Sequence, residues 1–200
     1  YFEACGLKGS TTIYDYQKKE WMTNDPNDSQ TQTLPASTFK IVNTLIALDV
    51  KAVQDEQEII PWIEDYDTVK YGHRPNIYHS MSMKEAFRLS AGWAYIELAK
   101  KIGKPKYKEY LTAMDYGNVD LSTEGDDFWN FGGFGISPAN QIEILIRIYE
   151  ETLPFSEQSF QTLKEMMIEE KTDDFIIRAK TGWTREGGKD TGWWVGYLET

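Results

Sequence analysis

The sequence is poor in cysteine and has no long apolar run. Its single cysteine, Cys5, cannot form an internal disulfide, and we expect it to be a small buried residue. No stretch of about 18 consecutive apolar residues is present, so the sequence predicts no transmembrane helix. The residues before Cys5 lack the basic and apolar regions of a signal peptide, and we expect no signal peptide in this chain. Secretion as a mature form stays open.

Positive charge and histidine are also scarce. The 21 Lys and Arg residues face 32 Asp and Glu residues, which gives a formal net charge of −11. Such a balance argues against nucleic acid as a partner, because phosphate binding needs a basic surface. An anionic substrate would require a local basic pocket. The two histidines, His73 and His79, have no ligand-like spacing and no accompanying cysteine, so we expect no metal site.

The composition that is present suits one packed domain. The chain has 200 residues, of which 40% are hydrophobic and 14% aromatic. Strand patterns occur near both ends and helical patterns between them, which predicts a mixed α/β (α+β) fold. We expect one antiparallel sheet built from both chain ends, about residues 1–33 and 172–200, with a helical lobe inserted at about 34–171.

Turn and capping signals place the individual elements. We expect strands at 9–14 and near Trp21, and again at 175–180 and 191–198 around a Gly-rich turn. We expect helices that begin at Ser37, Ser82 and Ser137, helices at 93–102 and 106–114, and a helix from Ser156 through Ile168.

The stretch from Leu34 to Leu48 carries the first candidate chemistry. It opens with Pro35 and continues in the apolar spacing of a helix that is buried along one side. Ser37 and Lys40 are three residues apart and therefore share a helix face, so the amine can reach the hydroxyl. A buried lysine can act as the base that activates a serine nucleophile. The alternative is an ordinary buried helix with a serine cap and a lysine whose amine reaches solvent.

Three further triplets follow later in the chain, at residues 90–92, 116–118 and 180–182. Lys180-Thr-Gly182 ends a predicted strand, where glycine would let a ligand approach the backbone. Ser90-Ala-Gly92 lies between two helices, where a hydroxyl could project into a cleft, and Tyr116-Gly-Asn118 is a turn on the same lobe. Each triplet alone would usually be a cap or a turn. Together with Ser37-x-x-Lys40 they match the signature of penicillin-recognising serine enzymes.

With these motifs the chain resembles the class D, or oxacillinase-type, serine β-lactamases over almost its whole length. The resemblance rests on these segments: Ala36–Leu48, Tyr116–Asn118, Phe128-Trp129 before Ile136-Ser137, Lys180–Trp183 and Gly192–Gly196. It implies the penicillin-recognising serine enzyme fold, hydrolysis of the β-lactam ring of penicillin-type antibiotics, and a periplasmic or secreted bacterial protein.

The resemblance also implies residue roles. Ser37 would attack the β-lactam carbonyl, and the backbone N–H groups of Ser37 and Trp183 would stabilise the oxyanion. Lys40 would add carbon dioxide to become N6-carboxylysine and act as general base, so bicarbonate would be needed but no metal or organic cofactor. Trp129 would hold the carbamate through its indole N–H, although plain core packing is the alternative for it. The remaining implied site residues are Ser90 as a proton relay and, for the substrate, Lys180, Thr181, Gly182, Trp183, Tyr116 and Asn118.

The sequence departs from that family's pattern at several positions. Gly92 stands where a valine is usual, Trp93 where proline is typical and Asn130 where leucine is frequent. The small Gly92 leaves more room for water, so we expect a carbamate that is loosely held. The chain ends at Thr200, before the further strand, helix and substrate-binding arginine of the family, and its first helix is short. We therefore expect a domain that is trimmed at both ends.

Two alternatives to a hydrolase remain at this stage. One is a sensor domain that is acylated by a β-lactam without turnover. Trp93 slightly favours this alternative, whereas Gly92, where such sensors usually have asparagine, and the lack of a predicted membrane helix argue against it. The other is a cell-wall transpeptidase, which usually carries Ser-x-Asn where this chain has Ser90-Ala-Gly92. The sequence leaves open which β-lactams are accepted and whether the protein is a monomer or a homodimer.

Overall fold

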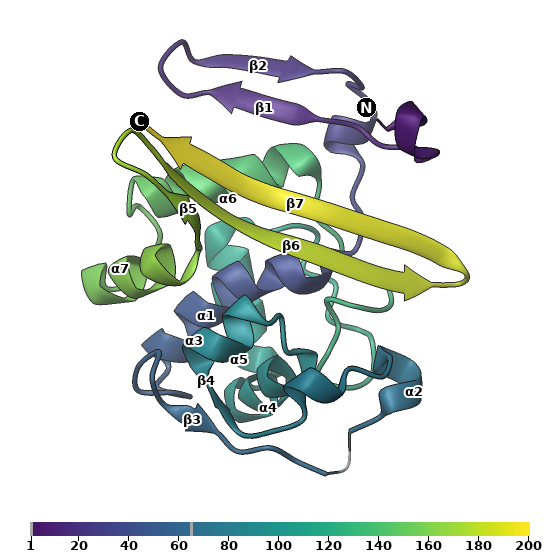
Figure 1. The fold of residues 1–200 in the computed structure, drawn as a ribbon, viewed down its shortest axis with the longest axis vertical. Helices are drawn as coiled ribbons and strands as arrows, with labels where there is room; N and C mark the ends of the chain where they lie inside the picture. The colour runs from purple at the N-terminus through teal and green to yellow at the C-terminus, as the bar shows by residue number, and fades with distance from the viewer. Residues whose placement is uncertain (1, 65) are drawn as a thin grey trace.

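The computed structural model describes residues 2–64 and 66–200. Its largest sheet has three antiparallel strands in the order β5 (Ile168–Lys171), β6 (Ile176–Glu186) and β7 (Lys189–Glu199). β6 and β7 pair along their full lengths and are joined by a turn at Gly187 and Gly188, both with positive φ. Figure 1 shows this long hairpin crossing the upper half of the molecule, with most of the helices below it.

The N-terminal hairpin forms a sheet of its own. β1 (Thr12–Asp15) and β2 (Glu20–Thr23) pair only with each other in the part of the chain that the structure describes. The mixed α/β fold class with antiparallel sheets is confirmed, but the expectation of one sheet built from both chain ends is wrong. The short hairpin is held by a helix instead: the Tyr16 hydroxyl donates to Glu150 at 2.7 Å, and its ring lies 5.4 Å from that of Tyr149.

Helices make up the segment between the hairpins. The α-helices are α1 (Lys40–Asp49), α2 (Thr68–Tyr71), α3 (Met83–Arg88), α4 (Gly92–Ile102), α5 (Lys104–Met114), α6 (Pro138–Tyr149) and α7 (Glu157–Met166). The 3-10 helices are η1 (Glu3–Cys5), η2 (Asp28–Gln30), η3 (Ala36–Phe39) and η4 (Pro75–Ile77), and β3 (Ile59–Ile60) pairs with β4 (Met81–Ser82). Ser82, Ser137 and Ser156 cap their helices as expected, because each side chain accepts a backbone N–H three residues later.

Two local expectations are wrong. The helix that was expected through Ile168 ends at Met166, and Ile168 begins β5, where it pairs with Arg178. Residues 168–171 therefore belong to the sheet and not to the helical lobe. Cys5 is exposed instead of buried, because η1 buries none of its residues.

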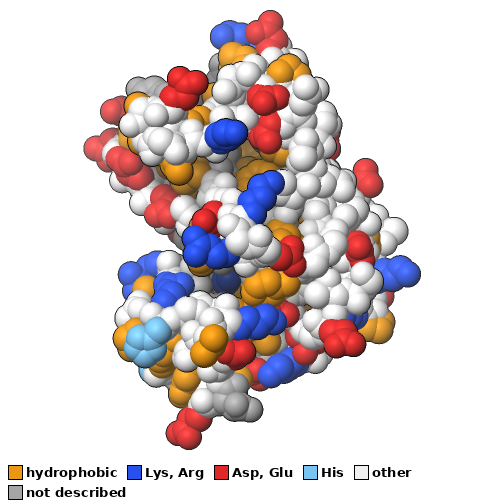
Figure 2. All heavy atoms as spheres, turned by 90° about the vertical axis from the view of Figure 1, so that its right-hand side faces the viewer, with side chains coloured by type: hydrophobic (Ala, Val, Ile, Leu, Met, Phe, Trp, Pro, Cys, Tyr) orange, Lys and Arg blue, Asp and Glu red, His pale blue; other side chains and the backbone are white. Residues whose placement is uncertain are grey.

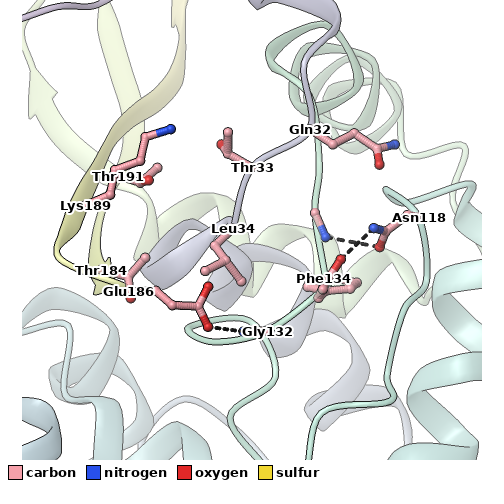
Figure 3. A pocket seen from close by; sticks show the side chains of 12 residues that line it. Gln32, Thr33, Leu34, Asn118, Gly132, Phe134, Thr184, Glu186, Lys189 and Thr191 are labelled. Atoms are coloured by element: carbon pink, nitrogen blue, oxygen red, sulfur yellow. Dashed lines mark hydrogen bonds between the residues drawn. The ribbon is translucent and has the colours of Figure 1, made fainter.

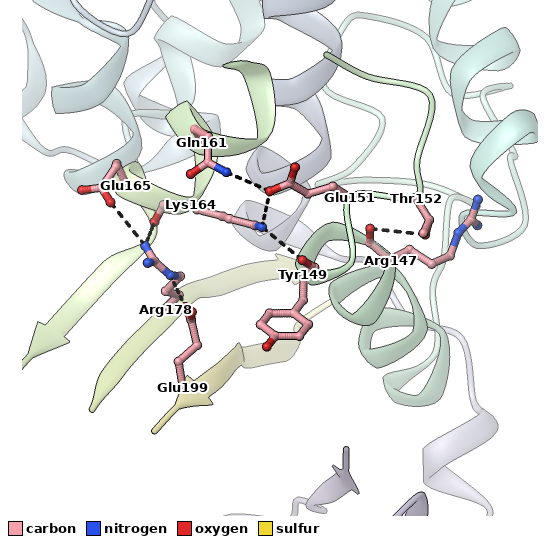
Figure 4. A network of polar contacts seen from close by, with 9 residues as sticks. All are labelled: Arg147, Tyr149, Glu151, Thr152, Gln161, Lys164, Glu165, Arg178 and Glu199. Atoms are coloured by element: carbon pink, nitrogen blue, oxygen red, sulfur yellow. Dashed lines mark hydrogen bonds and ion pairs between the residues drawn. The ribbon is translucent and has the colours of Figure 1, made fainter. Parts of the chain in front are cut away.

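A network of polar contacts joins α6, α7 and the sheet (Figure 4). The Lys164 ammonium contacts Glu151 at 2.6 Å and the Tyr149 carbonyl at 3.1 Å. The buried Arg178 guanidinium donates to Glu199 and to the Lys164 carbonyl. Because Lys164 and Arg178 are little exposed, their contacts lose less to solvent screening, and the network links α7 to α6 and to β6 and β7.

The core centres on Phe39 and α1. Every residue from Lys40 to Leu48 is buried, so α1 is enclosed on all sides. Five aromatic rings have centroids 5.2–5.8 Å from that of Phe39: Tyr107, Tyr116, Phe128, Trp129 and Phe134. Burying a large aromatic side chain stabilises a fold by roughly 2–3 kcal/mol, so this cluster fixes the start of α1 firmly. No helix in the described ranges is long and apolar enough to cross a membrane.

Candidate active site

Ser37 and Lys40 lie in direct contact. Ser37 belongs to η3, and Lys40 is the first residue of α1, so one continuous helical run carries both. The Lys40 amine donates to the Ser37 hydroxyl at 2.8 Å. The contact expected from the three-residue spacing is therefore present, with the hydroxyl in the first turn.

Burial perturbs Lys40 strongly. Its side chain is 1% exposed, and the Tyr95 ring lies 5.1 Å from the amine. Desolvation lowers the pKa of Lys40 well below its ordinary value, and the positive charges of Lys180 and Arg74 lower it further. The neutral amine is thus favoured, which is the form that can accept a proton or react with carbon dioxide.

Trp129 packs directly against η3, the short helix that contains Ser37. Its ring is stacked on that of Phe39, with centroids 5.2 Å apart, and its carbonyl accepts the Ala36 N–H at 2.9 Å. The indole is fully buried, yet its Nε1 has no hydrogen-bond partner among the described residues. Core packing accounts for the ring but not for a buried donor without an acceptor, which is costly.

The backbone is strained on two sides of the cleft. Ala36 and Ser90 have φ of 50° and 53°, a left-handed conformation that non-glycine residues rarely adopt. Ala36 directly precedes Ser37, and Ser90 lies in the turn between α3 and α4. Strain of this kind is often found at functional sites.

The strand β6 supplies the opposite wall of the cleft. Ser37 and Ser90 line a cleft of about 390 Å³ together with Lys180, Thr181, Gly182 and Trp183. The three-strand sheet therefore meets the helical lobe here. Figure 2 shows Lys and Arg side chains on both sides of a hollow between these two parts of the molecule.

Lys180 is buried but keeps a charged neighbour. It is 5% exposed, and its amine donates to the Thr181 carbonyl at 3.0 Å. Desolvation lowers the pKa of Lys180 to about 8, against the effect of the Glu169 carboxylate, which raises it. The side chain is thus still mostly protonated at neutral pH.

Gly182 serves a close approach within the chain itself. A Cβ at this position would lie 2.9 Å from the Pro35 carbonyl oxygen and 3.1 Å from the Thr38 amide nitrogen. The sequence indicated room for a ligand at this glycine. The missing side chain also lets β6 pack on η3, and Gly182 lines the same cleft as Ser37 and Lys180.

Tyr116 and Asn118, which the resemblance placed in the substrate site, do not line the cleft that contains Ser37. The Tyr116 ring is buried between Phe39 and Phe134. The Asn118 side chain donates to the Gly133 carbonyl and accepts from the backbone of residues 120 and 135. Turn formation accounts for Asn118 and packing for the Tyr116 ring, whereas the buried Tyr116 hydroxyl, like the Trp129 N–H, has no hydrogen-bond partner among the described residues.

Two of the three departures from the family pattern, Gly92 and Trp93, contact residues 66–78, and the third, Asn130, contacts β6. A Cβ on Gly92 would lie 3.3 Å from the Tyr66 hydroxyl oxygen, so Tyr66 takes up the extra room that was expected there. The Trp93 indole donates to the Ile77 carbonyl at 2.6 Å. Asn130 accepts a hydrogen bond from Thr184 through its backbone carbonyl, at 2.7 Å.

Sequence patterns missed several residues of the cleft. Arg74 lines it and donates to the carbonyls of Leu89 and Ser90 at 2.8 and 3.4 Å. Glu169, on β5, and Phe87, whose ring lies 5.7 Å from the Lys180 amine, line it too. Arg74 comes from an irregular segment without periodicity, so no signal in the sequence could have placed it here.

A second hollow of about 340 Å³ lies near the end of β6 and the start of β7 (Figure 3). It is lined by polar side chains, including Thr33, Asn118 and Lys189, and by the loop at 132–135. Glu186 crosses one side of it and accepts the Gly132 N–H at 2.6 Å. It shares no lining residue with the cleft that contains Ser37. Within residues 2–64 and 66–200, no group of three His, Cys, Asp or Glu side chains is arranged to hold a metal.

Comparisons with known proteins agree with the geometry. Residues 9–200 match the family described as the penicillin binding protein transpeptidase domain. The chain is 39% identical to the β-lactamase OXA-20 of Pseudomonas aeruginosa, across 100% of this chain and 72% of that protein.

Solved structures of class D β-lactamases share the fold. One from Nostoc superposes with a TM-score of 0.92 at 35% identity, covering 99% of this chain and 82% of that one. Another, from Sebaldella termitidis, gives a TM-score of 0.90 at 42% identity and covers 99% and 78% of the two chains.

Proposed function

This chain belongs to the class D β-lactamase family, and on that premise we propose that it hydrolyses β-lactams through an acyl-enzyme on Ser37, with a carbamylated Lys40 as general base. The observation that carries the proposal is the 2.8 Å contact between the Lys40 amine and the Ser37 hydroxyl in a buried setting. A serine becomes a strong nucleophile only when such a neighbour takes its proton.

The first half of the reaction acylates the enzyme. The Ser37 oxygen bonds to the β-lactam carbonyl carbon, its proton passes to the base on Lys40, and the ring C–N bond breaks. Ser90, on the rim of the same cleft, relays a proton to the leaving nitrogen. The N–H groups of Ser37, at the start of a helical run, and of Trp183 stabilise the oxyanion.

The residues around Lys40 fit a carbamate. The lowered pKa keeps the amine in the form that can add carbon dioxide, and Trp129 offers a buried N–H that lacks an acceptor. When present, the carbamate supplies a base that accepts protons near neutral pH. Trp129 would hold its negative charge, and the aromatic cluster around Phe39 would keep bulk water away. Water then cleaves the ester on Ser37, which frees the enzyme.

Charge accounts for how an acidic protein takes an anionic substrate. Lys180 with Thr181 binds the substrate carboxylate on the β6 wall, and Arg74 adds positive charge across the cleft. Local basic charge of this kind focuses an anion into a cleft even when the net charge is −11. A location in the periplasm or outside the cell, where β-lactams arrive, belongs to the same proposal.

Intact-mass spectrometry with a penicillin tests the nucleophile. We expect one adduct on the wild type and none on Ser37→Ala, with Ser156→Ala, a helix cap far from the cleft, as the matched control. An equal adduct on Ser37→Ala would refute the assignment.

Steady-state turnover separates a hydrolase from the sensor alternative. Many equivalents of a chromogenic cephalosporin should be consumed, faster with bicarbonate than in degassed buffer, and a stoichiometric burst alone would indicate a sensor. The names of the relatives favour hydrolysis. Equal rates with and without bicarbonate, and no carbamate carbon signal on Lys40, would remove the carbamate from the proposal.

A further inference from the structure

We propose that residues 66–78, here called the bridging segment, position two catalytic groups at once: Trp129 through the carboxylate of Asp127, and Ser90 through Arg74. The inference rests on the proposed function, because it assigns a purpose to the places of those two groups. The segment contains α2 and η4 and has no regular pattern in the sequence.

The first anchor is a buried carboxylate. Asp127 is 3% exposed, and its Oδ2 accepts from the Lys70 ammonium at 2.9 Å and from the Tyr71 hydroxyl. The Lys70 ammonium also lies 4.5 Å from the centre of the Phe131 ring. A carboxylate withdrawn from water needs such partners, so loss of both would leave an uncompensated charge. Asp127 is therefore held by two donors from α2.

Asp127 transmits this anchoring to Trp129. The two residues share one turn, which the Asn130 N–H closes by donating to the Asp127 carbonyl at 2.9 Å. Stacking on Phe39 and full burial set the plane of the Trp129 ring. The backbone that carries this ring belongs to the Asp127 turn, so we infer that the α2 donors fix the position from which the indole N–H is presented.

The second anchor acts on the turn that carries Ser90. The Arg74 guanidinium donates to the carbonyls of Leu89 and Ser90. Ser90 keeps its left-handed conformation only if its surroundings enforce it. The Arg74 guanidinium binds the carbonyls of both peptide groups that flank the Ser90 Cα.

Aromatic packing joins the two anchors into one unit. The rings of Tyr66 and Tyr71 are stacked with centroids 4.9 Å apart, and the Tyr66 hydroxyl covers Gly92. The Trp93 indole binds the Ile77 carbonyl near the end of the segment. Both residues in which the Ser90 turn departs from its family pattern thus contact the bridging segment, which indicates that segment and turn form one fitted arrangement.

Single-turnover kinetics with a chromogenic cephalosporin test the inference, with the acyl-enzyme followed by intact mass. Since small misplacements of catalytic groups cost roughly 10- to 100-fold, we expect Lys70→Met with Tyr71→Phe to slow deacylation about tenfold and acylation less than about threefold. At saturating substrate, where the charge that Arg74 adds to the cleft no longer limits binding, Arg74→Met should give the opposite split, because Ser90 acts in acylation, and Arg74→Lys should restore part of the rate. Lys100→Met, which removes an ion pair with Glu97 on the surface of α4, is the matched control.

The split distinguishes positioning from general support of the fold. A variant that is only less stable lowers the amplitude of acyl-enzyme formation and leaves both rate constants unchanged, and that result would overturn the inference. Equal slowing of both steps in both variants would overturn it as well. If the double variant fails to fold, Tyr71→Phe alone must still slow deacylation selectively. A wild type that forms no adduct would instead break the proposed function.

Discussion

Two regions of the molecule each hold a buried lysine at the same site, Lys40 in contact with Ser37 and Lys180 on the wall of the cleft, and the two lysines differ in their neighbours. Lys40 begins α1 inside the aromatic core, 1% exposed, and the charges that perturb it are all positive. Lys180 lies on β6, 5% exposed, with Glu169 acting on it from β5. Similar burial therefore lowers the pKa of Lys40 well below its ordinary value, whereas the pKa of Lys180, beside a carboxylate, stays at about 8.

The difference teaches how one residue type serves two tasks. Without a carboxylate nearby, desolvation favours a neutral Lys40 that contacts the Ser37 hydroxyl. With a carboxylate nearby, the pKa of Lys180 stays at about 8, and a positive charge remains at neutral pH. In the proposed mechanism the core region would therefore supply the base, and the sheet region would supply a positive charge for the substrate.

Lys40→Met should break the comparison most completely. Removal of the base should lower β-lactam turnover about 10³-fold, the usual range for general base catalysis being about 10²–10⁴. The same change should stabilise the fold by about 1–2 kcal/mol in degassed buffer, because a desolvated ionisable group is replaced by an apolar one. Turnover assays and thermal denaturation measure the two effects.

The stability gain has a pH dependence of definite sign. The pKa of Lys40 is lowered in the folded state, so between that pKa and the unfolded value of about 10.4 the unfolded chain binds one more proton. The cost of Lys40 therefore grows as pH falls from 10 towards 7. The gain in melting temperature for Lys40→Met should be larger at pH 7 than at pH 10, and a gain that is equal at both pH values would contradict a lowered pKa.

Trp129→Phe should affect only the core region. It keeps an aromatic ring on Phe39 but removes the N–H that has no partner among the described residues. We expect deacylation to slow about 100-fold and acylation to change less, since one positioned donor is worth roughly 10²–10³ in rate. Rapid-quench mass spectrometry separates the steps. If both steps keep their rates and bicarbonate still stimulates turnover, Trp129 is a packing residue only.

Gly182→Ala should weaken the junction between the two regions. Its new methyl group would press on the Pro35 carbonyl and on Thr38, which we expect to cost about 2 kcal/mol of stability and about tenfold in acylation. Gly192→Ala is the control on the neighbouring strand, because a Cβ there meets no atom within 4 Å. Urea denaturation and adduct formation measure both, and equal behaviour of the two variants would mean that β6 and η3 tolerate separation.

Local rules predicted the parts of this site that depend on short-range geometry. The three-residue spacing placed Lys40 beside Ser37, and serine caps located α3, α6 and α7. The motifs that contain Ser90 and Lys180 also supply residues of the cleft that Ser37 lines.

Long-range packing decided what the sequence could not predict. The positions of Arg74 and Asp127 depend on tertiary contacts of an irregular segment. Tyr116 packs against Phe39 and does not line the cleft around Ser37. The start of β5 at Ile168 likewise depends on its pairing with Arg178, while the residues before it still follow a helical pattern.

Lys180→Arg should give the smallest effect at neutral pH. At pH above neutral it should sharpen the comparison between the two lysines. Arginine keeps its proton throughout, so it preserves the charge of Lys180 with altered geometry, and we expect kcat/KM to fall only about threefold at pH 7. In the wild type the amine loses its proton as pH rises through about 8, so attraction of the substrate carboxylate is present below that pH and lost above it. Wild-type kcat/KM should therefore fall between pH 7.5 and 9, whereas that of Lys180→Arg should stay level there. Bound carboxylate favours the protonated amine, so the basic limb of kcat should lie at higher pH than that of kcat/KM. A basic limb that survives unchanged in Lys180→Arg would assign that ionisation to another group and leave Lys180 as a structural contact of β6.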